Sequence, residues 1–204
     1  MLDNANARRS AARFIDPVAR LMLRLKVTPD GITWFGCGAT IFISVALLAQ
    51  GEFLIGAILF GAFGLIDLLD GTMARMLGTA GPWGAFLDST LDRISDAAVI
   101  CALIYFYVNA DSSNSQLAVI AGIVSLVMSL MTSYARAKAE SLDAKCTVGI
   151  AERAERNLLI WVALLISALV TDVMPYALAA LAVLSTITVI QRILFVRKQL
   201  VIKA

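Results

Sequence analysis

The sequence predicts an all-α integral membrane protein with six transmembrane helices, preceded by an N-terminal amphipathic helix that lies in the membrane interface. Of the 204 residues, 60% are hydrophobic and only 16% are charged, whereas a soluble domain is nearer half apolar and a quarter charged. The apolar residues gather into stretches of about 20, the length that a helix needs to cross a bilayer. The total length suits a single membrane domain over residues 1–204.

The first predicted element, residues 6–26, carries too many charges to cross a membrane. Its apolar residues Phe14, Val18 and Leu21 recur at spacings of four and three. This pattern is typical of an amphipathic helix whose arginines face anionic lipid headgroups. The stretch Thr28-Pro29-Asp30 that follows predicts a cap at the start of the next helix, with Asp30 or Thr28 near the N-cap.

Six apolar segments follow, and each is bounded by turn-forming residues such as Gly51, Pro82 and Pro175. The predicted transmembrane helices cover residues 30–49, 53–77, 84–109, 115–140, 155–172 and 175–197.

The placement of charge supports six spans. In that topology all 17 Lys and Arg residues lie on one side of the membrane, and the opposite loops hold Glu52, Asp111 and Asp172 without a basic residue. Positive residues mark the cytoplasmic side. We therefore expect a multi-pass protein of the cell (plasma) membrane with both termini and the active site in the cytoplasm.

Four aspartates lie in or beside the second and third predicted spans. Asp67 and Asp70 are three residues apart, and Asp88 and Asp92 are four apart, so each pair shares one face of its helix. The short connection makes the two helices antiparallel neighbours, so both pairs can meet at the cytoplasmic side. Clustered carboxylates repel each other in a low dielectric. Either some of them are protonated, or a hard divalent cation such as Mg²⁺, Mn²⁺ or Ca²⁺ neutralises them.

Small residues and a cation accompany these carboxylates. Gly71 follows Asp70 directly, and Arg75 lies on the same side. Carboxylates, a metal, small residues and one arginine suit a pyrophosphate group, which indicates phosphate transfer at the membrane surface. The structural alternative is that the aspartates form ion pairs with Arg75 and Arg93. The chain has no histidine, which excludes His-based acid–base catalysis and Ser–His triads.

The pattern Asp67-x-x-Asp70-Gly71-x-x-Ala74-Arg75, followed after eight residues by Gly84-x-x-x-Asp88-x-x-x-Asp92, resembles the signature of the CDP-alcohol phosphotransferases. This resemblance implies that an alcohol displaces CMP from a CDP-linked donor, and that the protein is a homodimer. It also implies two Mg²⁺ or Mn²⁺ ions held by Asp67, Asp70, Asp88 and Asp92, with Asp92 as the catalytic base. The residues that it implies for binding CDP-diacylglycerol are Asp30, Gly31, Ile32, Thr33, Gly71, Arg75 and Gly81.

Four further stretches resemble the actinobacterial phosphatidylinositol phosphate synthases: residues 28–30, 88–96, 133–140 and 149–156. This resemblance implies inositol 1-phosphate as the acceptor, with phosphatidylinositol phosphate and CMP as products. An acceptor that carries a phosphate needs cations near the reacting groups. We expect its phosphate to bind at Ser133, Arg136, Arg153 and Arg192.

Asp96 and the tryptophans have less direct interpretations. Asp96 is predicted to pair with Arg93 or an arginine of the interfacial helix, or to orient Asp92. The three tryptophans, including Trp83, are predicted to anchor the protein at the interface or to pack in the bundle.

Other functions remain open at this stage. The acceptor could be glycerol 3-phosphate, as in a phosphatidylglycerophosphate synthase. The aspartates could instead serve a divalent-cation or proton transporter, although such sites usually lie near mid-membrane between repeated halves, and the sequence shows no repeat. A lipid-binding scaffold without activity is a third class. We expect membrane lipids and no nucleic acid among the partners.

Overall fold

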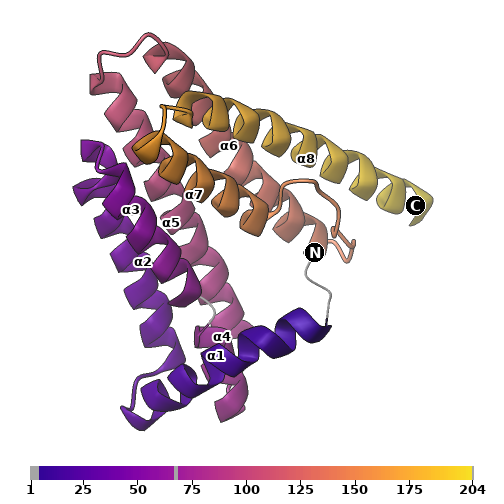
Figure 1. Cartoon of the computed structure of the whole chain (residues 1–204). Coiled ribbons are helices and arrows are strands. Elements are labelled where there is room, and N and C mark those ends of the chain that lie inside the picture. The colour runs from indigo at the N-terminus through magenta and orange to yellow at the C-terminus, as the bar shows by residue number, and fades with distance from the viewer. Residues whose placement is uncertain (1–4, 67–68, 204) are drawn as a thin grey trace. The chain divides into compact units, whose positions relative to one another are not determined.

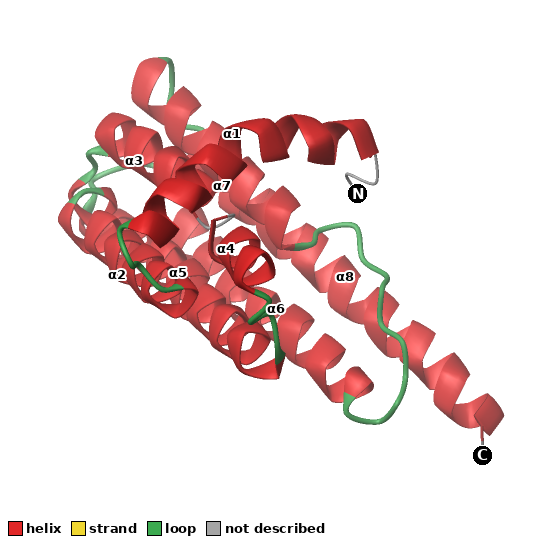
Figure 2. Ribbon diagram, turned by 90° about the horizontal axis from the view of Figure 1, so that it is seen from below, coloured by secondary structure: helices red, strands yellow, loops and turns green. Residues whose placement is uncertain are grey.

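The computed structural model describes residues 5–66 and 69–203, which form eight α-helices and one short 3₁₀ helix (Figure 1). The α-helices are α1 (Ala5–Arg24), α2 (Pro29–Ala46), α3 (Phe53–Ile66), α4 (Leu69–Leu77), α5 (Pro82–Asn109), α6 (Ser115–Glu140), α7 (Arg153–Leu169) and α8 (Met174–Lys203). Figure 2 shows these helices joined by loops, and no strand occurs within the two described ranges. The predicted all-α class is confirmed.

The helices occupy the segments in which the sequence places them. α6 begins and ends at the predicted residues, and α3 and α4 lie within the predicted segment 53–77, of which residues 67–68 are outside the described ranges. Four segments of the described chain are long and apolar enough to cross a membrane, namely Pro29–Gln50, Phe53–Leu77, Ser115–Glu140 and Met174–Val201. α7 has only 17 residues, and α5 carries the charged residues Asp88, Asp92, Arg93 and Asp96.

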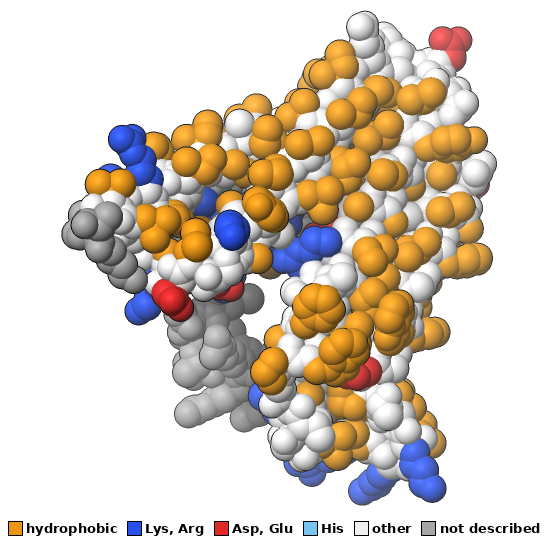
Figure 3. All heavy atoms as spheres, turned by 180° about the vertical axis from the view of Figure 1, so that it is seen from behind, with side chains coloured by type: hydrophobic (Ala, Val, Ile, Leu, Met, Phe, Trp, Pro, Cys, Tyr) orange, Lys and Arg blue, Asp and Glu red, His pale blue; other side chains and the backbone are white. Residues whose placement is uncertain are grey.

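Large hydrophobic side chains are exposed along the helices. Phe42 is 70% exposed and Val108 is 63% exposed, and many other large apolar side chains of the helices are also exposed. Figure 3 shows one face of the molecule on which hydrophobic side chains predominate. Soluble monomers rarely expose contiguous apolar patches of more than a few hundred Å². Together with the four apolar helices, this surface identifies a multi-pass membrane protein.

The chain divides into two compact units, of which the first comprises Met1–Ile43 and Ile58–Ser95. In this unit α1 packs against α4 through a small core of buried apolar residues from α1, α2 and α4, which are Ala19, Ile32, Leu69 and Met73. α2 packs against α5 where Cys37 meets Leu87 and Leu91. These contacts bring the start of α2 close to α4 and to the start of α5.

The second unit comprises Ser44–Ala57 and Asp96–Ala204. α8 packs against α6 and α7, and the buried Ser125 of α6 donates a hydrogen bond of 2.9 Å to the carbonyl of Leu178 in α8. α5 approaches α6 closely at Gly122, where an added Cβ would lie 2.6 Å from Ile104. Small residues permit such close packing of membrane helices.

Candidate active site

The start of α2 is shaped by a local cap. The Thr28 hydroxyl accepts a hydrogen bond of 3.1 Å from the amide of Gly31, three residues on, and Pro29 is the first helical residue. A threonine before the helix and a proline in its first turn are favoured because the early amide groups have no partner within the helix. Since Thr28 caps the helix, the Asp30 carboxylate is available for a different contact, and it accepts a 2.9 Å hydrogen bond from the indole of Trp83.

Asp70 lies in the first turn of α4 and is 8% exposed. One of its carboxylate oxygens accepts a 2.7 Å hydrogen bond from the Thr33 hydroxyl of α2, and the other accepts the amide of Gly71. The contact with Thr33 also ties α2 to α4.

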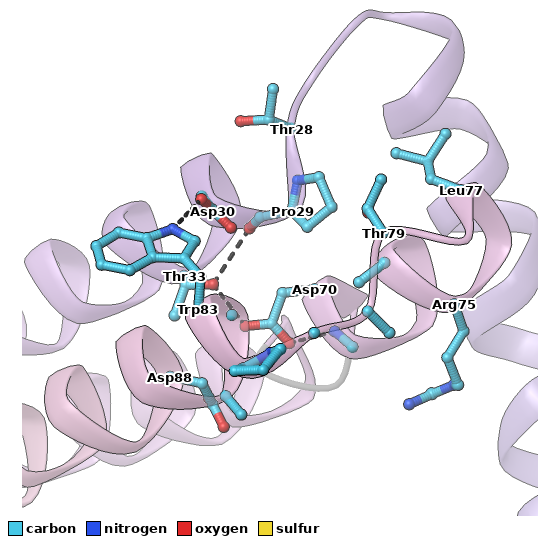
Figure 4. Close-up of a pocket in the computed structure, with 17 residues that line it drawn as sticks. Thr28, Pro29, Asp30, Thr33, Asp70, Arg75, Leu77, Thr79, Trp83 and Asp88 are labelled. Carbon is cyan, nitrogen blue, oxygen red and sulfur yellow. Dashed lines mark hydrogen bonds between the residues drawn. The ribbon is translucent and has the colours of Figure 1, made fainter.

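These residues line a pocket of about 730 Å³ within the first unit. Its walls are the start of α2, the helix α4 with the turn that follows it, and the first turns of α5. Figure 4 shows Asp70 beside Thr33, with the Asp30–Trp83 pair on one side and Arg75 on the other.

Most of the residues predicted to bind CDP-diacylglycerol lie in this pocket. Its lining includes Asp30, Thr33, Gly71, Arg75 and Gly81.

Two of the predicted residues do not line the pocket. Ile32 is 7% exposed and lies in the small core with Ala19 and Met73. Gly31 contributes its amide to the Thr28 cap. Consecutive residues of a helix point in different directions, so neighbours of the pocket residues need not line the pocket themselves. Gly31 and Ile32 instead stabilise the start of α2.

The Arg75 side chain lies over Gly71. Its guanidinium donates a 3.0 Å hydrogen bond to the Thr72 hydroxyl, and a Cβ added at Gly71 would lie 3.2 Å from the same guanidinium. The missing side chain at Gly71 thus leaves the room that the Arg75 cation occupies beside the pocket.

The four predicted metal ligands have different surroundings. Asp70 and Asp88 both line the pocket, whereas Asp92, one turn further along α5, is 8% exposed and does not line it. One oxygen of Asp92 lies 3.5 Å from the Arg93 guanidinium. Asp67 lies outside the described residues.

Among the residues that the structure describes, no three His, Cys, Asp or Glu side chains form a group that could hold a metal ion. Since Asp67 is not among them, the predicted set of four carboxylates stays a prediction. The donors that the described residues contribute are carboxylate oxygens, which suit Mg²⁺ or Mn²⁺.

The sequence predicts Trp83 as an interface anchor or a packing residue of the bundle, and not as part of a pocket. Trp83 lines the pocket and is 62% exposed, and its ring lies 6.1 Å from that of Phe86. An isolated tryptophan at the end of an apolar segment resembles an interface anchor. Its place directly before Gly84, within the spaced aspartate pattern, was the signal that could have indicated the pocket.

The residues predicted for the acceptor phosphate lie in the second unit. Arg192 is 3% exposed and donates to the carbonyls of Thr132 and Val148. Thr132 directly precedes Ser133, so Arg192 lies beside that segment of α6. Arg136 lies within electrostatic range of Arg192 and pairs with Glu140 at 2.9 Å.

Arg153, the fourth predicted acceptor residue, begins α7. Its guanidinium lies 3.5 Å from one carboxylate oxygen of Asp96, and that of Arg156 lies 3.6 Å from the other. Asp96 therefore pairs with two arginines of α7 that lie 57 and 60 residues further along the chain. The sequence predicts Arg93 or an arginine of the interfacial helix as the partner of this carboxylate, and not the arginines of α7, because helical periodicity does not reveal which distant helix packs nearby.

Residues 26–190 match the CDP-alcohol phosphatidyltransferase family. The chain belongs to this family. The predicted resemblance and the predicted type of enzyme, a CDP-alcohol phosphotransferase, are therefore confirmed.

The relatives of this phosphatidyltransferase are named as synthases of inositol phosphate lipids. This chain is 40% identical over 196 residues to a phosphatidylinositol phosphate synthase of Cutibacterium acnes, and the match covers 92% of this chain and 94% of the relative. It is 39% identical to an archaetidylinositol phosphate synthase of Methanothermobacter thermautotrophicus, with 92% and 91% covered.

Solved structures of one relative also resemble it. The crystal structure of the Mycobacterium tuberculosis phosphatidylinositol phosphate synthase with CDP-DAG bound has a TM-score of 0.84 and 36% identity, and the match covers 91% of this chain and 94% of that one. The same mycobacterial protein has been solved in complex with manganese and citrate, with a TM-score of 0.83 and 88% and 87% covered.

Proposed function

We propose that this phosphatidyltransferase joins CDP-diacylglycerol to inositol 1-phosphate and releases phosphatidylinositol phosphate and CMP. The observation that carries the proposal is the pocket in the first unit, which unites Asp70 and Asp88 of the family signature with Asp30, Thr33 and Arg75. The names of the relatives favour inositol 1-phosphate over glycerol 3-phosphate as the acceptor.

The pocket would hold the cytidine diphosphate part of the donor. The Arg75 cation would neutralise charge on the pyrophosphate, and Gly71 and Gly81 would let it approach the backbone. The diacylglycerol chains would remain in the bilayer. The crystal structure of the mycobacterial relative with CDP-DAG bound supports this assignment.

Asp67, Asp70, Asp88 and Asp92 would hold divalent metal, which we propose to be two Mg²⁺ or Mn²⁺ ions. The mycobacterial relative solved with manganese and citrate supports the use of a divalent ion. When bound, such ions stabilise the negative charge on the reacting phosphate oxygens. The Thr33 hydroxyl would orient Asp70, as partners in the outer shell of metal sites commonly orient the ligands.

In the proposed reaction, a hydroxyl oxygen of the acceptor bonds to the phosphorus that carries diacylglycerol. The bond from this phosphorus to the bridging oxygen breaks, and CMP leaves with the electron pair. Asp92 would accept the proton of the attacking hydroxyl as a general base. Ser133, Arg136, Arg153 and Arg192 would bind the phosphate of the acceptor, and the location of Arg192 beside the Thr132–Ser133 segment supports a common site for part of this set.

We further propose that α5 and α7 complete six spans within one membrane domain, and that α1 is an amphipathic helix in the interface. The separation of charge in the sequence supports cytoplasmic termini and a cytoplasmic active site. The family resemblance supports a homodimer.

The deciding experiment measures CMP release by the purified protein in lipid nanodiscs with CDP-diacylglycerol and Mg²⁺. We expect turnover with inositol 1-phosphate and much slower turnover with glycerol 3-phosphate, and we expect Asp92→Asn to lose most of it. Faster turnover with glycerol 3-phosphate would assign a phosphatidylglycerophosphate synthase. Full activity of Asp92→Asn would refute its role as the base.

Cation flux separates the enzyme from a transporter. Liposomes that contain the protein should show no Mg²⁺, Mn²⁺ or proton flux in the absence of CDP-diacylglycerol. Flux without nucleotide, together with no release of CMP, would favour the transporter.

A further inference from the structure

The loop between α6 and α7, residues 141–152, runs along α8, and we refer to it as the strap (Figure 2). Side chains of α8 bind its backbone at three places, through Thr188, Arg192 and Gln199. These residues are spaced by four and seven, so they share one face of the helix. The strap is therefore an ordered element with its own set of hydrogen bonds.

Gln199 holds the end of the strap that lies nearest α6. Its side-chain oxygen accepts a 3.0 Å hydrogen bond from the amide of Lys145, and its side-chain nitrogen donates at 2.6 Å to the carbonyl of the same residue. The next residue, Cys146, is 1% exposed and lies in a small core against which Val196 and Leu200 of α8 pack.

Arg192 and Thr188 hold the middle of the strap. Arg192 donates a 2.9 Å hydrogen bond to the carbonyl of Val148. Gly149 has a φ angle of +147°, and a Cβ added there would lie 2.6 Å from the Thr188 methyl group. A residue with a side chain would both strain the backbone and push the strap away from α8.

The other end of the strap leads into α7. The Thr188 hydroxyl accepts a 3.1 Å hydrogen bond from the amide of Ala151, and the buried Arg156 donates at 3.2 Å to the Ala151 carbonyl. Arg153, two residues later, is the first residue of α7 and pairs with Asp96. The strap and Asp96 therefore determine together where the Arg153 guanidinium lies.

We propose that the strap positions Arg153 for the acceptor phosphate, and that Gln199 is a positioning residue for the acceptor. This inference rests on the proposed function. Gln199 makes the contacts that hold the end of the strap nearest α6. Without them only the contacts of Arg192, Thr188 and Arg156 would hold the strap, so the start of α7 would be positioned less firmly. An Arg that is not held in place binds a phosphate more weakly, because ordering it costs conformational entropy at each binding event.

The effect should fall on one substrate. The residues of the donor pocket lie between Thr28 and Asp88 and have no part in the strap. We expect Gln199→Ala to raise the KM for inositol 1-phosphate by roughly tenfold, because two hydrogen bonds of ordinary strength are lost. The KM for CDP-diacylglycerol should stay unchanged. Gln199→Glu keeps an acceptor for the Lys145 amide but loses the donor, and should give an intermediate KM.

Lys198→Ala is the matched control. Lys198 is the neighbouring exposed residue of α8, and its side chain leaves the α8 helix in a different direction from that of Gln199. It should leave both KM values at those of the unsubstituted protein. An equal rise in acceptor KM for both variants would show that the cause is a general disturbance of α8 and not the contacts with the strap, and would overturn the role of Gln199.

The reactivity of the Cys146 thiol shows whether the strap stays packed against α8, and it requires no assay of enzyme activity. In a Cys37→Ala, Cys101→Ala background, the buried thiol should react slowly with a maleimide, and Gln199→Ala should make it react faster, whereas Lys198→Ala should not. Unchanged labelling in Gln199→Ala would show that Gln199 does not hold the strap. Faster labelling with an unchanged acceptor KM would show that the strap does not position the acceptor site.

Failure of the proposed function and failure of the proposed role of Gln199 give different experimental results. If the unsubstituted protein does not turn over inositol 1-phosphate, the proposed function fails, and labelling of Cys146 still shows whether Gln199 holds the strap. If it does turn over inositol 1-phosphate and Gln199→Ala has the same acceptor KM, only the present inference fails.

Discussion

Single hydrogen bonds determine how the carboxylates of the pocket are presented. Asp70 accepts from Thr33 and from the Gly71 amide, and Asp30 accepts from Trp83. Each contact limits the rotation of a carboxylate and leaves it further lone pairs for a ligand, since an ionised carboxylate has about four acceptor positions. The orientation of these groups therefore depends on neighbours that carry no charge.

Thr33→Val tests this orientation. Valine has nearly the shape of threonine but cannot donate to Asp70. We expect the concentration of Mg²⁺ that gives half-maximal CMP release to rise by about tenfold or more, as for other residues that orient metal ligands. Thr186→Val in α8 is the control, because that hydroxyl donates to the carbonyl of Ala182 in its own helix. Identical Mg²⁺ curves for both variants would contradict the prediction.

Gly71→Ala tests the room beside Arg75. The added Cβ would lie 3.2 Å from the guanidinium, so Arg75 must shift away from the pocket. We expect the KM for CDP-diacylglycerol to rise by roughly tenfold, as for the loss of one charge-assisted hydrogen bond. Gly38→Ala in α2 has open space around the new Cβ and should leave that KM unchanged. An unchanged KM in Gly71→Ala would exclude a contact between Arg75 and the donor.

At the scale of helices, Asp96 links α5 to the first turn of α7. Its side chain is 15% exposed, and the side chain of its partner Arg156 is 5% exposed. Removing one member of a buried pair leaves the other charge without compensation, which costs more than the pair itself contributes.

Asp96→Ala should therefore destabilise the protein by about 3 kcal/mol, near the lower end for a broken buried pair. For a chain of this length this corresponds to a fall in Tm of roughly 6–12 °C, measured by thermal unfolding in detergent. The control is Glu140→Ala, which removes a pair with Arg136 whose side chains are about half exposed. Exposed pairs contribute at most about 1 kcal/mol. Equal Tm values for both variants would contradict the role of Asp96.

At the scale of the whole molecule, the distribution of basic residues predicts the orientation in the membrane. A variant that lacks the native cysteines and carries Asp111→Cys as its only thiol should react with a membrane-impermeant maleimide in intact cells. A second variant, with Ser141→Cys in place of Asp111→Cys, should react only after the cells are permeabilised, because residue 141 follows α6 on the predicted cytoplasmic side. The opposite pattern would reverse the topology, and labelling of both in intact cells would contradict the number of spans between them.

Much of the fold could be predicted because it depends on local pattern. Most apolar stretches coincide with an observed helix, and α6 matches at both ends, whereas α8 ends at Lys203 and not at residue 197. The spacing of Asp67, Asp70, Asp88 and Asp92 indicated the family, which the comparison confirmed. Both signals come from residues within a few helical turns of one another, so they can be read along the chain.

Tertiary structure decided which residues share a site. Thr33 meets Asp70 across 37 residues, and Trp83 meets Asp30 across 53. Arg192 reaches the carbonyl of Thr132 across 60 residues. Helical periodicity states which face of a helix a residue occupies, but not which distant helix packs against that face. The sequence by itself determined the helices, the membrane environment and the type of chemistry. Only the packing of the helices determined that Trp83 joins the pocket, that Asp96 pairs with α7, and that α8 holds the strap.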